Sequence, residues 1–285
     1  MEVVRLGDAL GAEIHGLDIS QRLCDEDIDA IRRAWHEHHV ILFRGVEWSP
    51  EGQLEFAGRF GELDDHAATP NDSLKGFPKL LEVSTIPKNG KPSPTRTAGR
   101  DWHSDYAYTS HPASASLLYC IEKPEVGGDT MFCNMARAYS ELSEKMKGIA
   151  SELHSVYDFN MVSGAKDRTN NNLTKLNEIN PPVAHPTVRV HNESGVKALY
   201  VSERTSHFDG MTRSESAPLI RYFCEHATRP ENVYRHQWRV GDLVCWDNRT
   251  TMHLALGDFD LSARRRMLRA TVRGPKSGYV LNGAA

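Results

Sequence analysis

The sequence has few cysteines, and their spacing excludes a disulfide framework. The 285-residue chain contains five cysteines at scattered positions, and no C-x-x-C motif occurs. An odd number without a regular spacing is typical of reduced, mostly buried thiols. The pattern therefore favours a cytoplasmic protein over a secreted one.

Signals for a membrane or for nucleic acid are also missing. No run of about 18 apolar residues occurs, and no basic segment leads into an apolar one at the N-terminus, so we expect neither a membrane span nor a secretory signal. The net charge is −4, and the basic block that stands out is the short run 264–266. We therefore expect neither a membrane nor nucleic acid among the partners.

The pattern of apolar residues predicts a mostly β chain with helical cover. Helical spacing occurs at 25–38, 49–60, 135–150 and 214–227. Short apolar runs bounded by turn residues predict strands at 40–43, 80–83, 114–123, 129–134, 197–202, 233–238, 242–248, 251–256 and 266–274. We expect 114–123 and 129–134 to pair through the turn "PEVGG".

Many short strands after an initial helical portion indicate an α+β fold built on a sandwich or barrel of the jelly-roll kind. The chain has no internal repeat and no hinge-like linker, so we expect a single domain, 1–285. The long polar segment 162–182 is expected to be an active-site lid or a disordered insertion.

The stretch "WHSDYAY" at 102–108 contains the first candidate site. On an extended segment His103 and Asp105 point to the same side, with Ser104 turned away, and two such groups can chelate one metal ion. The alternative is a surface histidine and aspartate that meet by chance.

The best third ligand is His253, in "VCWDNRTTMHLAL", on another expected strand. Two histidines and one carboxylate on one face of a metal form the facial triad of non-haem Fe(II) oxygenases, which leaves positions for a co-substrate and O₂. Zinc accepts the same ligands. The alternative for His253 is a buried histidine bonded to its neighbours.

Alternation along "ARRRMLRATVRG" places Arg265 and Arg269 on one strand face and an apolar set on the other. Inward-facing guanidinium groups are costly unless each meets an anion, and a carboxylate matches them best. The alternative is an edge strand with a solvated basic face.

The motifs "LGAEIHGLDIS", "VILFRG", "WHSDYAY", "GGDTMFCNM", "WRVGDLVCWDNRTTMH" and "RRRMLRATVRG" occur in this order. Together they resemble the taurine dioxygenase / 2,4-dichlorophenoxyacetate dioxygenase family of Fe(II)- and 2-oxoglutarate-dependent oxygenases, over nearly the whole chain. The resemblance implies a double-stranded β-helix (jelly roll) with helical cover.

The resemblance also implies roles for individual residues. His103, Asp105 and His253 would hold Fe(II). Arg265 would pair with the distal carboxylate of 2-oxoglutarate, and Thr130 of "GGDT" would give that carboxylate a hydroxyl hydrogen bond. A slip of one residue within 264–266 stays open.

Arg269 would lie closer to the metal, near the other carboxylate of the co-substrate or near the substrate anion. Formal counting over metal, ligands, co-substrate and Arg265 leaves Arg269 as a spare cation, which favours an acidic substrate. His66 aligns with a substrate-anion ligand of the family, or is a loop histidine. Tyr106 and Tyr108 line the pocket or simply pack.

The expected function is catabolic: O₂-dependent hydroxylation of a small aryloxyalkanoate, other carboxylate or sulfonate, often with C–O or C–S cleavage, releasing succinate and CO₂. Two alternatives stay open, a zinc-dependent hydrolase on the same scaffold and a non-catalytic binding protein. Self-association as a dimer or tetramer is also left open.

Overall fold

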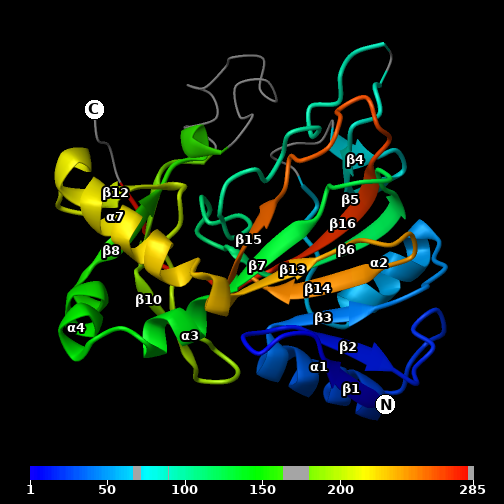
Figure 1. The fold of residues 1–285 in the computed structure, drawn as a ribbon, viewed down its shortest axis with the longest axis horizontal. Helices are drawn as coiled ribbons and strands as arrows, with labels where there is room; N and C mark the ends of the chain where they lie inside the picture. The colour runs from blue at the N-terminus through cyan, green and yellow to red at the C-terminus, as the bar shows by residue number, and fades with distance from the viewer. Residues whose placement is uncertain (67–71, 89, 163–179, 282–285) are drawn as a thin grey trace.

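A computed structural model describes residues 1–66, 72–88, 90–162 and 180–281. The described part is mostly β, with helices on the outside, as the sequence predicts (Figure 1). The predicted lid at 162–182 lies almost wholly outside the described residues.

The largest sheet contains eight strands, which are antiparallel neighbours except for one parallel pair near the N-terminus. In spatial order they are β1 (Glu2–Arg5), β2 (Ala12–His15), β3 (Val40–Phe43), β14 (Leu243–Asp247), β6 (Ala113–Glu122), β16 (Arg266–Arg273), β5 (Phe77–Ser84) and β4 (Ser73–Leu74).

A three-stranded sheet faces this large sheet. Its strands, in spatial order, are β13 (Val233–His236), β7 (Thr130–Asn134) and β15 (Thr251–Ala255). The two sheets share an apolar layer, in which the ring centroids of Phe132 on β7 and Trp246 on β14 lie 5.5 Å apart. Two facing antiparallel sheets of this kind confirm the predicted jelly roll.

A second group of elements lies at one end of this sandwich (Figure 1). Its described residues form a four-stranded sheet, a two-stranded sheet, three α-helices and two short 3₁₀ turns. The strands are β12 (Thr205–Phe208), β8 (His154–Tyr157), β9 (Val183–Pro186) and β17 (Tyr279–Val280), then β10 (Val188–Val190) and β11 (Lys197–Leu199). The helical elements are α3 (Met135–Ser140), α4 (Glu144–Glu152), α7 (Arg213–Ala227), η2 (Phe159–Met161) and η3 (Pro230–Asn232).

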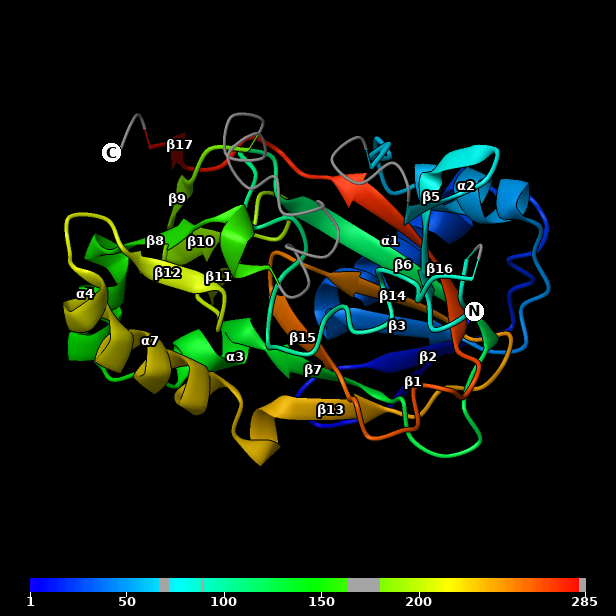
Figure 2. The same ribbon diagram turned by 90° about the horizontal axis from the view of Figure 1, so that it is seen from above.

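Helices α1 (Asp25–His38) and α2 (Pro50–Gly58) cover the outer face of the large sheet, on the side away from β13, β7 and β15 (Figure 2). In α1, Ile28, Ile31 and Trp35 recur at helical spacing and are buried, as expected of an amphipathic helix. The apolar face of β16 packs into the same cluster. The opposite face of β16 is thereby turned toward the facing sheet.

The expected pairing of 114–123 with 129–134 is wrong. Both segments are strands, but β6 lies between β14 and β16 in the large sheet, whereas β7 lies between β13 and β15. The connection between them includes Gly127 and Gly128, both with positive φ, and it crosses from one sheet to the other. Turn residues between two strands indicate a reversal of the chain, but they do not identify the sheet that the second strand joins.

The expected helix at 135–150 is two helices, α3 and α4. The break has a local cause, because the side chain of Ser143 accepts a hydrogen bond from the backbone N–H of Met146 and starts a new helix. The other expected helices and strands are confirmed, with their ends within three residues of the predicted ones.

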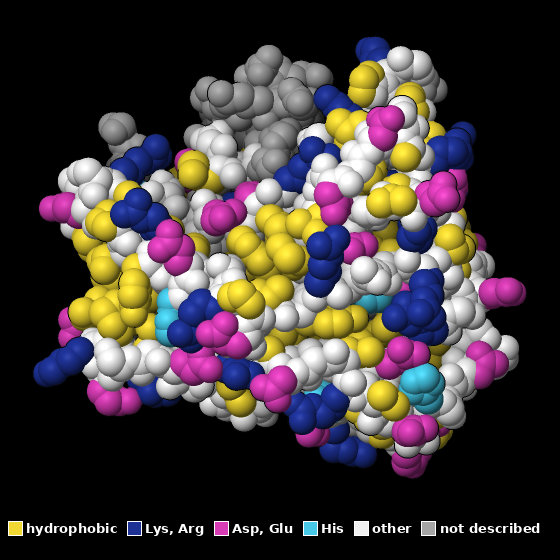
Figure 3. Space-filling view, viewed as in Figure 1, with side chains coloured by type: hydrophobic (Ala, Val, Ile, Leu, Met, Phe, Trp, Pro, Cys, Tyr) yellow, Lys and Arg dark blue, Asp and Glu magenta, His cyan; other side chains and the backbone are white. Residues whose placement is uncertain are grey.

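Within the described ranges, no helix is long and apolar enough to cross a membrane. On the face drawn in Figure 3, basic and acidic side chains are interspersed. All five cysteines are unpaired, and four of them are buried.

Candidate active site

A cavity of about 840 Å³, including its mouth, opens between the two facing sheets. Eight residues singled out from the sequence line it: His103, Asp105, Tyr106, Tyr108, Thr130, His253, Arg265 and Arg269. His66 is not among the described residues that line it.

Backbone pairing brings His103 and His253 together. The two residues form an isolated antiparallel bridge, with N···O distances of 3.1 Å and 2.8 Å. His253 lies on β15. The loop that carries His103 runs alongside this strand, because the N–H of Ala255 donates to the carbonyl of Gly99. Gly99 has φ +77°, and a Cβ there would lie 3.2 Å from Cε1 of His103, so the loop requires glycine at this position.

Asp105 completes a cluster with the two histidines. Its Oδ1 lies 3.9 Å from Nε2 of His103, and its Oδ2 lies 3.8 Å from Nε2 of His253. These separations are too long for direct hydrogen bonds. All three side chains are buried, and their candidate ligand atoms lie within 4.8 Å of one another. The expected meeting of these three side chains is thus found.

The protonation states of the cluster fit a metal ion. Nδ1 of His103 lies 2.7 Å from the carbonyl oxygen of Asp101, which can only accept, so Nδ1 carries the proton and Nε2 is left as a free lone pair. Burial lowers the pKa of His103 well below its ordinary value and that of His253 to about 4, so both rings are neutral at pH 7.

Asp105 is ionised. Burial opposes the charge of this carboxylate, but the charge of Arg269 and the hydrogen bond from Ser116 hold its pKa below the ordinary value. Two neutral imidazoles and a carboxylate are the deprotonated ligand set that a divalent metal requires. The residues present therefore fit the group that the sequence motif predicts.

A hydrogen-bond network fixes the orientation of Asp105. Its Oδ2 accepts from the hydroxyl of Ser116 at 2.6 Å, and its Oδ1 accepts from Nη1 of Arg269 at 2.6 Å. The side chain of Asn248 donates to Ser116 at 3.0 Å and accepts from the backbone N–H of Asp105 at 3.0 Å. Its oxygen also accepts from the indole of Trp246 at 3.1 Å. Ser116 and Asn248 are therefore functional candidates that the sequence analysis missed.

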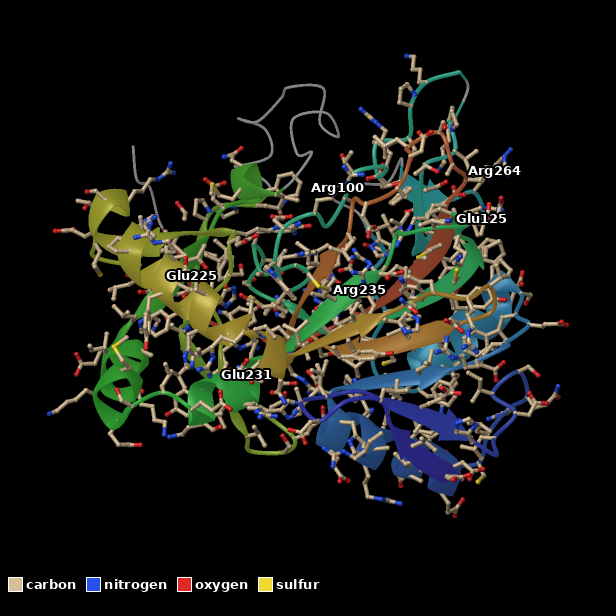
Figure 4. The ribbon with its side chains drawn as sticks, viewed as in Figure 1. Arg100, Glu125, Glu225, Glu231, Arg235 and Arg264 are labelled. Carbon is tan, nitrogen blue, oxygen red and sulfur yellow. The ribbon has the colours of Figure 1, made fainter. Side chains whose placement is uncertain are left out.

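The three consecutive arginines separate as the alternation predicts. Arg265 is buried and lines the cavity. Arg264 is exposed just before β16 (Figure 4) and pairs with Glu122. Arg266 pairs with Glu82. The register that the resemblance gave for Arg265 thus agrees with its placement.

The guanidinium of Arg265 has no acceptor among the described residues. The hydrogen bonds of Arg265 use its backbone: its N–H donates to the hydroxyl of Thr85 at 2.9 Å, and its carbonyl accepts from the N–H of Thr85 at 3.0 Å. Burial lowers the pKa of Arg265 to about 10, so the side chain is a buried cation at neutral pH. A buried unpaired cation is costly, and a carboxylate from a ligand would remove that cost.

Arg269 is not the spare cation that formal counting suggested, because it already binds Asp105. Its guanidinium carbon also lies 5.8 Å from the ring centroid of Tyr106. Its Nε has no hydrogen-bond partner among the described residues, so part of the guanidinium stays available to a ligand.

His66 supports the cavity wall and does not supply a cation. Its Nδ1 lies 2.5 Å from the hydroxyl of Tyr106. Burial and the nearby charge of Arg269 lower the pKa of His66 to about 4, so the ring is neutral at pH 7. Tyr106 has φ +54° and stacks edge-on against Tyr108 with ring centroids 5.7 Å apart, and both tyrosines face the cavity.

Arg204 is a third arginine at the cavity, and no sequence pattern pointed to it. Its Nε and Nη2 bind the carboxylate of Asp101 at 2.6 Å and 2.7 Å. The backbone carbonyl of the same aspartate holds His103, so Arg204 fixes the segment that carries this candidate ligand. Arg204 and Asp101 lie on two loops that are far apart in the sequence and meet only in the fold, so no local sequence pattern identifies the pair.

A second cluster with possible metal ligands consists of His36, His191 and Asp247. The polar atoms of His191 and Asp247 are already engaged. Both oxygens of Asp247 accept from Arg249, at 2.8 Å and 2.7 Å, and one of them also lies 2.9 Å from Nε2 of His191. Nδ1 of His191 accepts two backbone N–H groups. His191 and Asp247 therefore belong to a buried hydrogen-bond network, which His36 on α1 meets through a ring contact with His191.

Two histidines and a carboxylate inside a jelly roll are the arrangement of the non-haem metal-dependent oxygenases. The sequence model of the taurine catabolism dioxygenase TauD, TfdA family matches residues 2–271, and the chain belongs to this family. The resemblance seen in the sequence is thereby confirmed. The protein is a 2-oxoglutarate-dependent dioxygenase that requires a metal.

Relatives and solved structures agree with this family. The chain is 33% identical to an alpha-ketoglutarate-dependent 2,4-dichlorophenoxyacetate dioxygenase of Cupriavidus pinatubonensis, over 91% of this chain and 93% of that protein. It is 31% identical to an alkylsulfatase of Acinetobacter baylyi, over 96% and 85% respectively. The solved structure of AAD-2 in complex with Mn(II) and N-oxalylglycine superposes with a TM-score of 0.86 and 30% identity, covering 98% of this chain and 100% of that one.

The network around Asp105 makes a direct prediction. Ser116→Ala should weaken Mn(II) binding roughly 10- to 100-fold, because partners that orient a metal ligand commonly contribute that much affinity. Isothermal titration calorimetry measures the change. Ser114→Ala is the matched control, since Ser114 lies two residues away on β6 and bonds to the carbonyl of Val272. Equal losses in the two variants, or none in Ser116→Ala, would contradict the assignment.

Proposed function

We propose that the protein hydroxylates a small anionic organic molecule with Fe(II), O₂ and 2-oxoglutarate, and that His103, Asp105 and His253 hold the iron. Bound iron supplies O₂ activation coupled to oxidative decarboxylation of 2-oxoglutarate to succinate and CO₂. The chain itself holds the co-substrate, orients the substrate and keeps Asp105 ionised.

The observation that carries the proposal is the buried guanidinium of Arg265, which has no acceptor within the described part of the chain. An arginine in this state requires an anion, and a carboxylate accepts two parallel hydrogen bonds from it. Thr130 lines the same cavity and offers a hydroxyl. The two groups together suit the distal carboxylate of 2-oxoglutarate.

Buried charge also limits the substrate. Asp105, Arg265 and Arg269 sum to +1, and the pair of Arg204 with Asp101 is neutral. A divalent metal raises the sum to +3, and dianionic 2-oxoglutarate lowers it to +1. A substrate with one negative charge makes the closed site neutral, which a low-dielectric cavity favours.

The substrate therefore carries one carboxylate, sulfonate or sulfate group near Arg269, and its apolar or aryl body lies against Tyr106 and Tyr108. Relatives whose names specify 2,4-dichlorophenoxyacetate and sulfate esters support this class. Hydroxylation of the carbon beside an ether oxygen gives a hemiacetal, which breaks its C–O bond to release an alcohol or phenol and an aldehyde. An aryloxyacetate would thus yield a phenol and glyoxylate, together with succinate and CO₂.

His66 serves this site by holding the hydroxyl of Tyr106. A zinc hydrolase would use the same three ligands, but Arg265 and Thr130 would have no role in it. In a non-catalytic protein, the ordered hydrogen-bond network around Asp105 would have no role. A cytoplasmic location and self-association as a dimer or tetramer remain predictions.

Arg265 and Arg266 form a matched pair for a test of the co-substrate site. Arg265→Met should raise the 2-oxoglutarate concentration for half-maximal succinate formation roughly 30-fold or more, since loss of one partner of a buried charge pair costs on the order of 2–5 kcal/mol. Arg266→Met removes a partly exposed pair with Glu82 and should change it less than about twofold. Similar effects in both variants would show that Arg265 does not bind the co-substrate.

The single negative charge expected of the substrate can be tested without a variant. Phenoxyacetate should have a kcat/KM at least about tenfold higher than phenoxyacetamide, because the neutral amide leaves one net positive charge in the closed site and gives Nε of Arg269 no anionic acceptor. Phenol release and succinate formation are measured together. Equal turnover of the acid and the amide would remove the argument for a substrate anion at Arg269.

A further inference from the structure

Trp238 makes a hydrogen bond to Thr130, a residue that lines the cavity. It lies two residues beyond β13, opposite the start of β7, where His236 is paired with Thr130. Its indole Nε1–H donates to the hydroxyl oxygen of Thr130 at 3.0 Å. Both side chains are buried, and Thr130 faces the cavity.

The direction of this bond is fixed by chemistry. An indole N–H can only donate, so the hydroxyl of Thr130 must be the acceptor. The hydroxyl proton is then left for another partner, and none occurs among the described residues. A threonine hydroxyl otherwise rotates to suit its surroundings, as donor or as acceptor. Trp238 removes that choice.

Trp238 is itself held in place. Its ring packs edge-on against His236, with centroids 4.5 Å apart. Nε2 of His236 lies 3.1 Å from the carboxylate of Asp242, and its Nδ1 lies 3.1 Å from the hydroxyl of Tyr234. The same carboxylate accepts from Arg44 at 2.7 Å. The indole N–H therefore has a fixed direction before any ligand enters.

We propose that Trp238 is a positioning residue for 2-oxoglutarate, which orients the O–H of Thr130 toward the distal carboxylate. The inference rests on the proposed co-substrate site. Thr130 on one sheet then donates to one carboxylate oxygen, while Arg265 beside the other sheet donates to the rest of the group. Trp238 acts through Thr130 and makes no contact with the ligand.

The test is a double-mutant cycle on binding, with Mn(II) and N-oxalylglycine as probes in calorimetry. Thr130→Val should weaken N-oxalylglycine binding roughly tenfold, the scale of a hydrogen bond to a charged group. Trp238→Phe should weaken it several-fold. In the Thr130→Val background, Trp238→Phe should have almost no further effect, because residues that act through one contact are not additive.

Controls separate the hydrogen bond from folding. Replacing Trp238 with 3-benzothienylalanine keeps the ring shape and removes only the N–H, so it should reproduce the effect of Trp238→Phe even if phenylalanine impairs folding. Trp35→Phe removes a buried indole N–H that has no hydrogen-bond partner in the parts of the chain that the structure describes, and it should leave N-oxalylglycine binding unchanged. Mn(II) affinity should be the same in all these proteins.

Independent, multiplying losses from Trp238→Phe and Thr130→Val, or an unchanged affinity with the benzothienyl isostere, would overturn the inference. If Thr130→Val and Arg265→Met both left N-oxalylglycine binding unchanged, the proposed co-substrate site itself would be overturned.

Discussion

The cavity buries more positive than negative charge, and much of the site's organisation can be understood from that constraint. Asp105 is paired with Arg269, and Asp101 with Arg204, but Arg265 has no anionic partner among the described residues. An unpaired buried guanidinium would destabilise the fold by several kcal/mol if nothing bound to it. A metal, a dianionic co-substrate and a monoanionic substrate together bring the closed site to neutrality. The cavity without ligands therefore has a net positive charge, which the bound ligands would neutralise.

The groups that would meet metal and co-substrate and the other groups that line the cavity come from different parts of the fold. The groups that would meet metal and co-substrate lie on β7, β15 and β16 or directly beside them, where backbone pairing fixes their positions. Tyr106, Tyr108 and Arg204 lie on connecting segments. This arrangement agrees with a rigid reaction centre bordered by connecting segments, which are in general more variable than the strands that they join.

Alternation along extended segments was enough to predict much of the site. It placed His103 beside Asp105, and it separated Arg265 and Arg269 from the apolar face of β16.

Alternation could not identify four other residues, because each contacts its partner across strands or loops that meet only in the folded chain. These residues are Ser116, Asn248, Arg204 and Trp238. The failed pairing of β6 with β7 has the same origin, since local turn residues do not specify which sheet a strand joins. The charge states could not be predicted from the sequence either. The folded structure shows that His66 is neutral because it is buried, and that Arg269 is paired with Asp105.

The central claim is that His103, Asp105 and His253 present one iron site to 2-oxoglutarate. Anaerobic titration of the purified protein with Fe(II) in the presence of 2-oxoglutarate tests it most directly. The claim predicts a visible charge-transfer absorption band that saturates at one iron per chain and is absent in His103→Ala. A protein that binds stoichiometric zinc, develops no such band and consumes no O₂ after iron loading would contradict it.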